Sequence, residues 1–329
     1  MMLMTVLVTG AAGFIGFHTC RRLLERGERV VGIDNLNTYY DPALKRSRLA
    51  VLGEKPGFVF HMVDIADRAA MAEVAKANPD ITRYINLAAQ AGVRHSLNAP
   101  FDYTHSNVEG LLVLLEMARA NDKCEHVVYA SSSSVYGTNT KLPFSVEDRV
   151  DTPISLYAAT KRAGELMSHA YSHLFRIPTT GLRFFTVYGP WGRPDMAAYL
   201  FAKAILADQP IRVFNNGDMR RDFTYIDDIV AGVIGVLDNP PKDAAGVPPY
   251  HLYNIGNNNS EHLMDFIGLI EQSLGRKAIY QFEPMQPGDV KETYADISAI
   301  QRDVGFAPTT PISVGIPRFI DWFKAHHGV

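Results

Sequence analysis

A tyrosine and a lysine lie four residues apart in the segment Tyr157-Ala-Ala-Thr-Lys161. If this segment is helical, the spacing places the phenol and the ammonium on one face. A nearby cation favours the phenolate, so we expect the pKa of Tyr157 to fall from about 10 toward the range useful for proton transfer. An earlier serine cluster, 131–134, supplies hydroxyls, one of which is expected to orient a substrate hydroxyl, with Ser132 as the candidate. The pattern predicts an acid/base site built from Ser132, Tyr157 and Lys161, although an ordinary amphipathic helix would also contain such a pair.

A glycine-rich turn near the start of the chain predicts a phosphate-binding site. The segment Gly10-Ala-Ala-Gly13-Phe-Ile-Gly16 follows an apolar strand pattern and opens a helical one. Small residues let a pyrophosphate approach the backbone, and the helix N-terminus offers free N–H groups. Asp34 ends the next strand pattern, where a carboxylate accepts hydrogen bonds from ribose hydroxyls and repels a 2′-phosphate. The sequence therefore predicts NAD in preference to NADP, held at the turn by Gly10, Ala12, Gly13, Phe14, Ile15 and Gly16.

These residues lie among alternating strand and helix patterns. Short β-branched runs occur at 5–9, 29–33, 57–61, 83–87, 126–129 and 179–185, and helical apolar spacing occurs at 14–27, 67–77, 105–121 and 157–175. Such alternation predicts an α/β fold, a Rossmann-type doubly wound parallel sheet with helices on both faces. Ligands of these sheets bind beyond the carboxyl ends of the strands, where the predicted site residues lie.

The alternation breaks after residue 187, where Gly, Pro and Asn clusters become frequent. A chain of 329 residues also exceeds the usual length of one domain. A strand-like stretch at 252–255 and a helical pattern at 226–237 nevertheless suit the sheet. We therefore expect a NAD-binding Rossmann domain at 1–186 and 224–255, and a smaller C-terminal substrate-binding domain at 187–223 and 256–329.

Composition argues against several other classes of protein. A formal net charge of -3, without blocks of like charge, disfavours nucleic-acid partners and membrane surfaces. The early apolar run is too short to span a bilayer, and no basic leader precedes it. Two cysteines, Cys20 and Cys124, cannot form a disulfide scaffold or a multi-cysteine metal site, and the histidines are scattered. We expect a cytoplasmic protein with reduced thiols and no metal.

The glycine-rich turn, Asp34, the serine cluster and the Tyr157 and Lys161 pair resemble the extended short-chain dehydrogenase/reductases over essentially the whole chain. This resemblance implies further cofactor contacts and a homodimer. The apolar stretch 103–115 is a candidate for the dimer interface, although core packing explains it equally well. The implied cofactor contacts are Asn35, Asn37, Asp64, Ile65, Leu87, Ala88, Ala89, Gln90 and Asn107, together with Tyr157 and Lys161.

Longer motifs resemble one subfamily, the UDP-glucuronate 4-epimerases. The resemblance implies that hydride passes from C4 of UDP-glucuronate to NAD and returns to the opposite face of a 4-keto sugar. UDP-galacturonate would result, and NAD would stay tightly bound and be recycled. The motifs are Asp34-Asn-Leu-Asn-Thr-Tyr-Tyr-Asp-Pro42 with Leu44-Lys-Arg46, Ala89-Gln-Ala-Gly-Val-Arg94, Tyr188-Gly-Pro-Trp-Gly-Arg-Pro-Asp-Met196, Arg221-Asp-Phe-Thr-Tyr-Ile-Asp227 and Pro287-Gly-Asp289.

The same resemblance implies which residues contact the substrate. Arg221 would grip the UDP diphosphate. Arg193 and Thr186 would hold the C6 carboxylate, which suits a guanidinium because it can bind a carboxylate through two hydrogen bonds. Arg94 either assists or forms a salt bridge within the fold. Gln286 stands where related hexose epimerases often carry an arginine, with Lys291 as a candidate substitute.

Three alternatives to this epimerase stay open: a UDP-glucuronate decarboxylase, another UDP-hexose 4-epimerase, and an NAD-sensing binding protein. Resembling decarboxylases carry Thr-Ser-Glu before Val-Tyr-Gly, where this chain has Ser132, Ser133 and Ser134. Hydroxyls at these positions are expected to hold an intact carboxylate. The complete Ser132, Tyr157 and Lys161 set argues against a silent binding protein.

One cluster of positive charge follows Asp34. Lys45, Arg46 and Arg48 lie close enough in sequence to influence the choice of cofactor. A solvated helix face is the interpretation we favour for all three.

Overall fold

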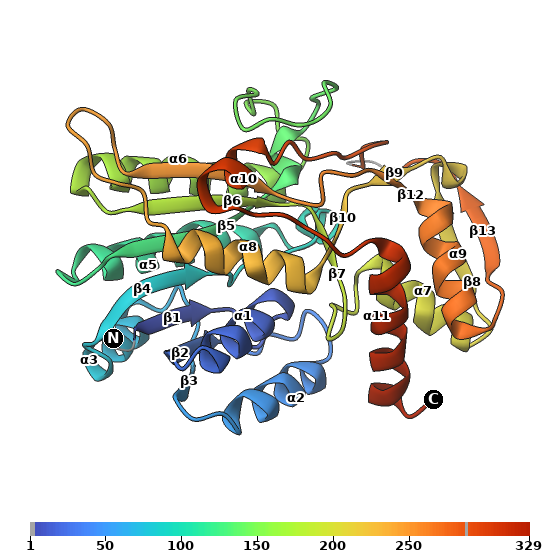
Figure 1. Cartoon of the computed structure of the whole chain (residues 1–329), viewed down its shortest axis with the longest axis horizontal. Coiled ribbons are helices and arrows are strands. Elements are labelled where there is room, and N and C mark those ends of the chain that lie inside the picture. The colour runs from blue at the N-terminus through green and yellow to red at the C-terminus, as the bar shows by residue number, and fades with distance from the viewer. Residues whose placement is uncertain (1–3, 287–288) are drawn as a thin grey trace.

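The computed structural model describes residues 4–286 and 289–329, which fold around a seven-stranded parallel sheet (Figure 1). The strand order is β11-β6-β5-β4-β1-β2-β3, so the chain reverses direction across the sheet between β1 and β4. The predicted α/β class with a doubly wound sheet is confirmed. The strands are β1 (Thr5–Thr9), β2 (Arg29–Asp34), β3 (Phe58–Met62), β4 (Ile81–Asn86), β5 (His126–Ser132), β6 (Thr179–Phe184) and β11 (Tyr250–Ile255).

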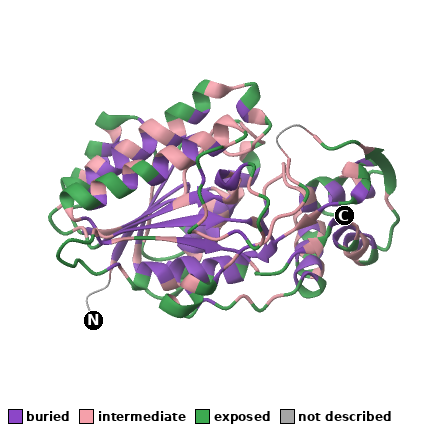
Figure 2. Cartoon of the chain, turned by 90° about the horizontal axis from the view of Figure 1, so that it is seen from above, coloured by how far each residue is buried: buried purple, intermediate pink, exposed green. Residues whose placement is uncertain are grey.

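Helices cover both faces of the sheet. On one face α1 packs beside α8, and on the other α3, α5 and α6 form a row. Figure 2 shows the buried strands between these two helical layers. Strands covered on both faces need apolar residues at successive positions, and Val6, Leu7 and Val8 of β1 are all fully buried. The helices are α1 (Phe14–Glu25), α2 (Pro42–Gly53), α3 (Arg68–Ala77), α5 (Gly110–Arg119), α6 (Leu156–Phe175) and α8 (Ile226–Asp238).

The second half of the chain supplies both the last strand of the sheet and a separate cluster of short elements. Helix α8 and strand β11 join the sheet, as the patterns at 226–237 and 252–255 predicted. Helix α10 (Ser298–Val304) packs on α8 and β11 beside the sheet. The other elements gather at the carboxyl ends of the strands (Figure 1). They are β7 (Thr186–Tyr188), α7 (Ala197–Leu206), β8 (Pro210–Phe214), β9 (Arg220–Arg221), β10 (Phe223–Tyr225), β12 (Glu261–His262), α9 (Leu263–Leu274), β13 (Ile279–Glu283) and α11 (Ile312–His327).

Two predicted helices begin where the site needs them. Helix α1 begins after Gly13, whose lack of a side chain leaves the first N–H groups without a cap. Helix α6 begins after Ser155, whose hydroxyl accepts a hydrogen bond from the Ala158 amide at 3.1 Å. This cap places Tyr157 in the first turn of α6.

The helix predicted over 105–121 is interrupted. A π-helical turn, η2 (Thr104–Glu109), precedes α5, and a short helix, α4 (Pro100–Tyr103), precedes that turn. Tyr103, Leu111, Leu114 and Leu115 are buried within the chain, so core packing accounts for these four residues of the stretch 103–115. A dimer interface on this stretch stays a prediction.

Both cysteines are free, with Cys20 buried and Cys124 half-buried. No helix within residues 4–286 and 289–329 is both long and apolar enough to cross a membrane. Pro287 and Gly288, which belong to one of the motifs, lie outside the described residues.

Candidate active site

A cavity of about 890 Å³ opens at the carboxyl ends of the strands. Its lining combines the glycine-rich turn, the end of β5 and the start of α6 with loops from the second half of the chain. Almost every predicted site residue lines it. The exceptions are Ala12 and Asn107, which are buried behind the lining: Asn107 exchanges hydrogen bonds with the backbone of Gln90, which does line the cavity.

The glycine-rich turn is suited to a pyrophosphate. Gly10 has φ +70°, and a side chain there would come within 2.8 Å of the Ala88 amide nitrogen. A Cβ at Gly16 would overlap the Gly10 carbonyl oxygen. The turn therefore permits only glycine at these points, and the uncapped N–H groups of α1 border the cavity as donors for an anion. The residues present fit a dinucleotide at this end of the cavity.

The ribose end is more elaborate than the sequence indicated. Asp34 is 6% exposed, and its Oδ1 accepts hydrogen bonds from the Leu36 amide at 2.8 Å and from Lys45 Nζ at 3.4 Å. Lys45 Nζ also donates to Asn37 Oδ1 at 2.9 Å. The lysine thus fixes two of the predicted cofactor contacts at once.

The expected solvated helix face of α2 is wrong for two of its three cations. Lys45 and Arg48 are 5% and 0% exposed, whereas Arg46 is exposed as predicted. Both buried cations find acceptors beneath the helix, since Lys45 reaches Asp34 and Arg48 reaches the Ala12 carbonyl oxygen at 2.8 Å. Sequence reasoning missed them because long basic side chains are usually found at the surface.

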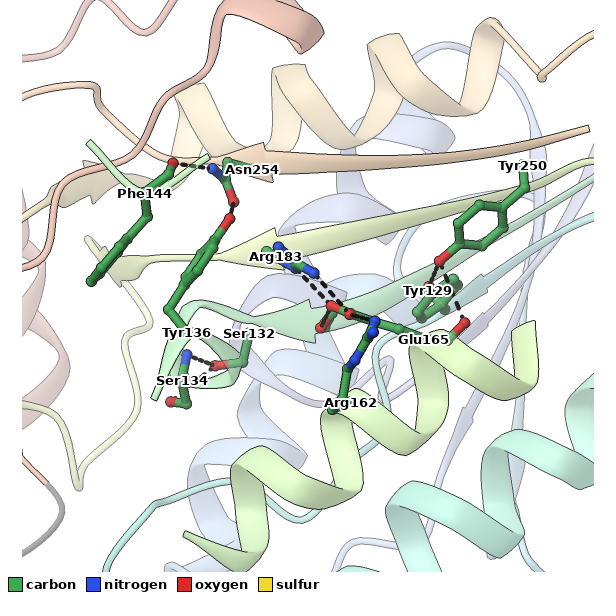
Figure 3. A network of polar contacts seen from close by, with 11 residues as sticks. Tyr129, Ser132, Ser134, Tyr136, Phe144, Arg162, Glu165, Arg183, Tyr250 and Asn254 are labelled. Carbon is green, nitrogen blue, oxygen red and sulfur yellow. Dashed lines mark hydrogen bonds and ion pairs between the residues drawn. The ribbon is translucent and has the colours of Figure 1, made fainter. Parts of the chain in front are cut away.

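The end of β5 is held by one face of α6. Lys161 Nζ donates to the Ala130 carbonyl at 2.8 Å, and the next strand residue, Ser131, donates through Oγ to Glu165 at 2.6 Å. Glu165 also binds Arg183 and Arg162, as Figure 3 shows. The buried ion pair therefore anchors the strand end next to Ser132.

Ser132 is the third consecutive strand residue at this end, and it caps its own turn. Its Oγ accepts from the Ser134 amide and lies 3.2 Å from Ser134 Oγ (Figure 3). Ser133 and Ser134 line the cavity with it, so the serine cluster presents hydroxyls where resembling decarboxylases carry a carboxylic acid.

The electrostatics of Tyr157 differ from the expectation. Burial raises the pKa of Tyr157, and a hydrogen bond from Ser132 and the positive charge of Arg193 oppose this without cancelling it. Burial lowers the pKa of Lys161 to about 8. The expected lowering of the Tyr157 pKa by Lys161 is therefore wrong for this structure, in which the lysine is directed to the Ala130 carbonyl and the nearby cation is Arg193.

Arg193 forms a bidentate pair inside the cavity. Its Nε and Nη2 donate to Asp195 at 3.0 and 2.5 Å, and Tyr39 donates to the same carboxylate at 3.1 Å. Although burial disfavours the charged form, Asp195 outweighs it and raises the pKa of Arg193. The pair uses one edge of the guanidinium and leaves the Nη1 side available for a second carboxylate. Thr186, the first residue of β7, lines the same region.

At the far end of the cavity, Arg94 and Arg221 lie among residues of the second half. Arg94 donates to Asp289 at 2.9 Å and stacks on Phe214 at 4.4 Å, so the salt bridge left open by the sequence is present. Arg221 Nη1 donates to the Lys291 carbonyl at 3.0 Å. Lys291 itself pairs with Asp218 at 2.7 Å and does not line the cavity, so its role as a substitute for the missing arginine stays a prediction without support from these contacts.

Several cavity residues were missed by sequence reasoning. Tyr39, Asp195 and Phe214 all line the cavity, and only the first two lie within motifs that had been singled out. Phe214 precedes an Asn-Asn-Gly turn that marks a strand end, but nothing in the sequence indicates which ligand that end would face.

The glycine-rich turn and the acid/base residues in one cavity define the class of dinucleotide-binding enzymes. Comparison with known proteins identifies the family. Residues 6–256 match the NAD dependent epimerase/dehydratase family, and the chain belongs to this family. UDP-glucuronate 4-epimerase 1 of Arabidopsis thaliana is 46% identical, with 98% of this chain and 77% of that protein covered.

Solved structures agree with this assignment. The UDP-glucuronic acid 4-epimerase from Bacillus cereus, in complex with UDP-glucuronic acid and NAD, is similar with a TM-score of 0.88 and 36% identity, covering 98% of this chain and 100% of that one. A tyrosine-to-phenylalanine mutant of the same enzyme, with UDP-4-deoxy-4-fluoro-glucuronic acid and NAD, has a TM-score of 0.89 with the same identity and coverage.

Proposed function

We propose that this protein is an NAD-dependent epimerase that inverts C4 of UDP-glucuronate to give UDP-galacturonate. The observation that carries the proposal is the presence of Tyr157 and Arg193 in one cavity, close enough for the charge of the arginine to act on the phenol. An acid/base group beside an available guanidinium suits a sugar that has both a reacting hydroxyl and a carboxylate. The similarity to UDP-glucuronate 4-epimerases over nearly the whole chain supports it.

The chain's own residues handle the proton and the orientation of the sugar. Bound NAD would supply the hydride acceptor for C4 and return the same hydride to the opposite face. The charge of Arg193, together with the positive charge of bound NAD, would favour the Tyr157 phenolate. As the phenolate, Tyr157 takes the proton of the C4 hydroxyl as the 4-keto sugar forms, and gives it back when C4 is reduced again. Ser132 orients the C4 oxygen toward the phenol. No net oxidation occurs, so the cofactor is recycled.

The remaining site residues hold the two anionic ends of the substrate. Arg193 and Thr186 hold the C6 carboxylate, and Arg221 and Arg94 lie where the diphosphate would pass. A 4-keto uronate is a β-keto acid that can lose carbon dioxide. The hydroxyls of Ser132, Ser133 and Ser134 offer no acid for elimination, which favours epimerisation over decarboxylation or dehydration.

One assay tests the reaction. Purified protein is incubated with UDP-glucuronate without added NAD, and the products are separated by chromatography. UDP-galacturonate is expected. A UDP-pentose would indicate a decarboxylase, and activity with UDP-glucose alone would indicate another epimerase. In parallel, Tyr157→Phe should abolish turnover but still bind UDP-glucuronate, and normal turnover by this variant would refute the role of Tyr157.

We also propose that the protein is a cytoplasmic homodimer. Free thiols suit a reducing compartment. Leu97 of the turn η1 (His95–Leu97), Phe101 of α4 and Leu166 of α6 are 69%, 84% and 56% exposed, on elements that contact one another. Sedimentation velocity should give a dimer, and Leu166→Glu should shift it toward monomer.

A further inference from the structure

The loop 189–196, which carries Arg193, is held by donors from the other half of the chain. His18 of α1 donates through Nε2 to the Pro190 carbonyl at 2.9 Å. Arg48 of α2 donates through Nη2 to the Trp191 carbonyl at 2.6 Å. His18 and Arg48 are 3% and 0% exposed, so both contacts are shielded from water. Burial lowers the pKa of His18 to about 3, which leaves the ring neutral with its proton on the nitrogen that faces the carbonyl.

The same guanidinium reaches the cofactor end of the cavity. Arg48 Nη1 donates to the Ala12 carbonyl of the glycine-rich turn at 2.8 Å and to the Tyr40 hydroxyl at 2.9 Å. Among residues 4–286 and 289–329, Arg48 forms no ion pair, and its Nε has no partner. A buried cation without a carboxylate is costly unless its hydrogen bonds are made. The positions of these carbonyls are therefore tied to Arg48.

The backbone of the loop needs such support. Trp191 has φ +62°, in the left-handed region that residues other than glycine seldom adopt. Its ring packs on Phe17 of α1 at 5.2 Å and on Trp322 of α11 at 5.5 Å. Side-chain packing and two buried donors therefore fix an unusual turn, and Arg193 follows two residues later.

We propose that Arg48 is a positioning residue for Arg193. By holding the Trp191 carbonyl, Arg48 fixes the position of the Arg193 guanidinium, which binds the C6 carboxylate of a nucleotide-linked uronate. It thereby contributes to the preference for a uronate over a neutral hexose. This inference rests on the proposed function. The buried face of α2 then acts at both ends of the site. Arg48 holds the loop that carries Arg193, and Lys45 holds the ribose-binding residues Asp34 and Asn37.

The test compares two ligands that differ only at C6, UDP-glucuronate and UDP-glucose. Their Kd values are measured by calorimetry on NAD-loaded protein in a Tyr157→Phe background, so that neither ligand is converted. The ratio of the two Kd values reports the carboxylate contact. Arg48→Met should reduce the preference for UDP-glucuronate about tenfold or more, with UDP-glucose binding within about twofold, because a charge-assisted hydrogen bond is lost indirectly. Arg48→Lys should restore part of the preference.

A matched control separates positioning from general destabilisation. Arg83 on β4 also donates to a backbone carbonyl, that of Leu237 at 3.0 Å, but does not contact the loop. Arg83→Met should leave the ratio of the Kd values unchanged. If Arg48→Met does not fold, His18→Phe removes the other donor and should shift the ratio about threefold in the same direction.

Two results would overturn the inference, and they differ in what else they overturn. If Arg48→Met, or His18→Phe where Arg48→Met does not fold, is folded and keeps the ratio of Kd values of the Tyr157→Phe protein, Arg48 does not position Arg193, and the proposed function stands. If the wild-type protein forms no UDP-galacturonate, and the Tyr157→Phe protein binds UDP-glucuronate and UDP-glucose equally, the proposed function fails together with this inference.

Discussion

Replacing Lys161 with methionine is expected to stabilise the cofactor-free protein at neutral pH while it abolishes catalysis. Lys161 is 8% exposed, and burial lowers its pKa from 10.5 to about 8. This shift corresponds to about 3 kcal/mol against the charged form. The hydrogen bond from Nζ to the Ala130 carbonyl, which methionine cannot make, is worth about 1 kcal/mol. Lys161→Met should therefore raise the free energy of unfolding by about 2 kcal/mol at pH 7.

The sign of this effect depends on pH. Between about 8 and 10.5 the unfolded lysine keeps its proton and the folded one has released it, so the wild type becomes more stable as the pH rises. The stability from this group is present above the unfolded pKa and is lost as the pH falls through 8. The methionine variant has no such dependence. Its advantage at pH 7 should shrink with rising pH and become a disadvantage of about 1 kcal/mol above pH 10.5.

Urea unfolding of NAD-stripped protein at pH 7, 8, 9 and 10 measures this pH dependence. At each pH, the free energy of unfolding of the wild type is subtracted from that of the variant. Lys242→Met, at an exposed lysine, serves as the matched control and should show no such trend. A Lys161→Met variant that is less stable than the wild type by the same amount at every pH would refute the reasoning. In that case the ammonium would not be strained by burial.

Three further predictions concern the turn, the loop and a buried acid. Gly16→Ala should lose NAD in equilibrium dialysis, because its Cβ overlaps the Gly10 carbonyl, whereas Gly53→Ala meets no atom within 4 Å and should bind normally. Arg193→Lys should weaken the binding of UDP-glucuronate by about 10- to 100-fold in calorimetry and change the affinity for UDP little, since lysine cannot bind two oxygens of a carboxylate through a planar pair of donors. Burial raises the pKa of Asp222 from 3.8 to about 6, so wild-type stability should fall by about 3 kcal/mol between pH 4 and 6. Asp222→Asn should lack that slope in urea unfolding, and equal slopes in the two proteins would contradict the assignment.

The fold could be predicted because its signals are local. Apolar β-branched runs such as 5–9 coincide with β1, and the capping serine before Tyr157 lies next to the helical pattern that it begins. The glycine-rich turn is partly specific for the same reason, since Gly16 is required by contact with the Gly10 carbonyl six residues earlier. Gly10 itself is required by its positive φ and by the backbone of Leu87 and Ala88, which follow the neighbouring strand β4. The boundaries of the two domains stay a prediction.

The parts of the site that could not be predicted arise from contacts between distant segments. Arg48 meets Trp191 across 143 residues of sequence, and Tyr39 meets Asp195 across 156. No spacing rule links such pairs, so the sequence predicts a solvated face for α2 where the structure has a buried one. The pKa of Tyr157 was mispredicted for a related reason, since the helical spacing to Lys161 was visible but the Ala130 carbonyl that binds the lysine was not.

The cations around the cavity divide into two kinds, and the division explains how a chain of net charge -3 can bind an anionic nucleotide sugar. Arg193 and Arg94 are paired with Asp195 and Asp289, which orient their guanidinium groups and cancel most of their long-range field. Within residues 4–286 and 289–329, Lys161 and Arg221 have no such partner, and burial lowers the pKa of each.

An unpaired, partly desolvated cation gains most when an anion arrives, because the cost of its burial has already been met by folding. The paired arginines are therefore expected to select the shape of the ligand. Lys161 and Arg221 are expected to supply more of the charge-dependent part of the affinity. Salt should accordingly weaken ligand binding more in the wild type than in Arg221→Gln. The double variant Arg193→Gln/Asp195→Asn removes both members of a neutral pair and should keep a salt dependence close to that of the wild type.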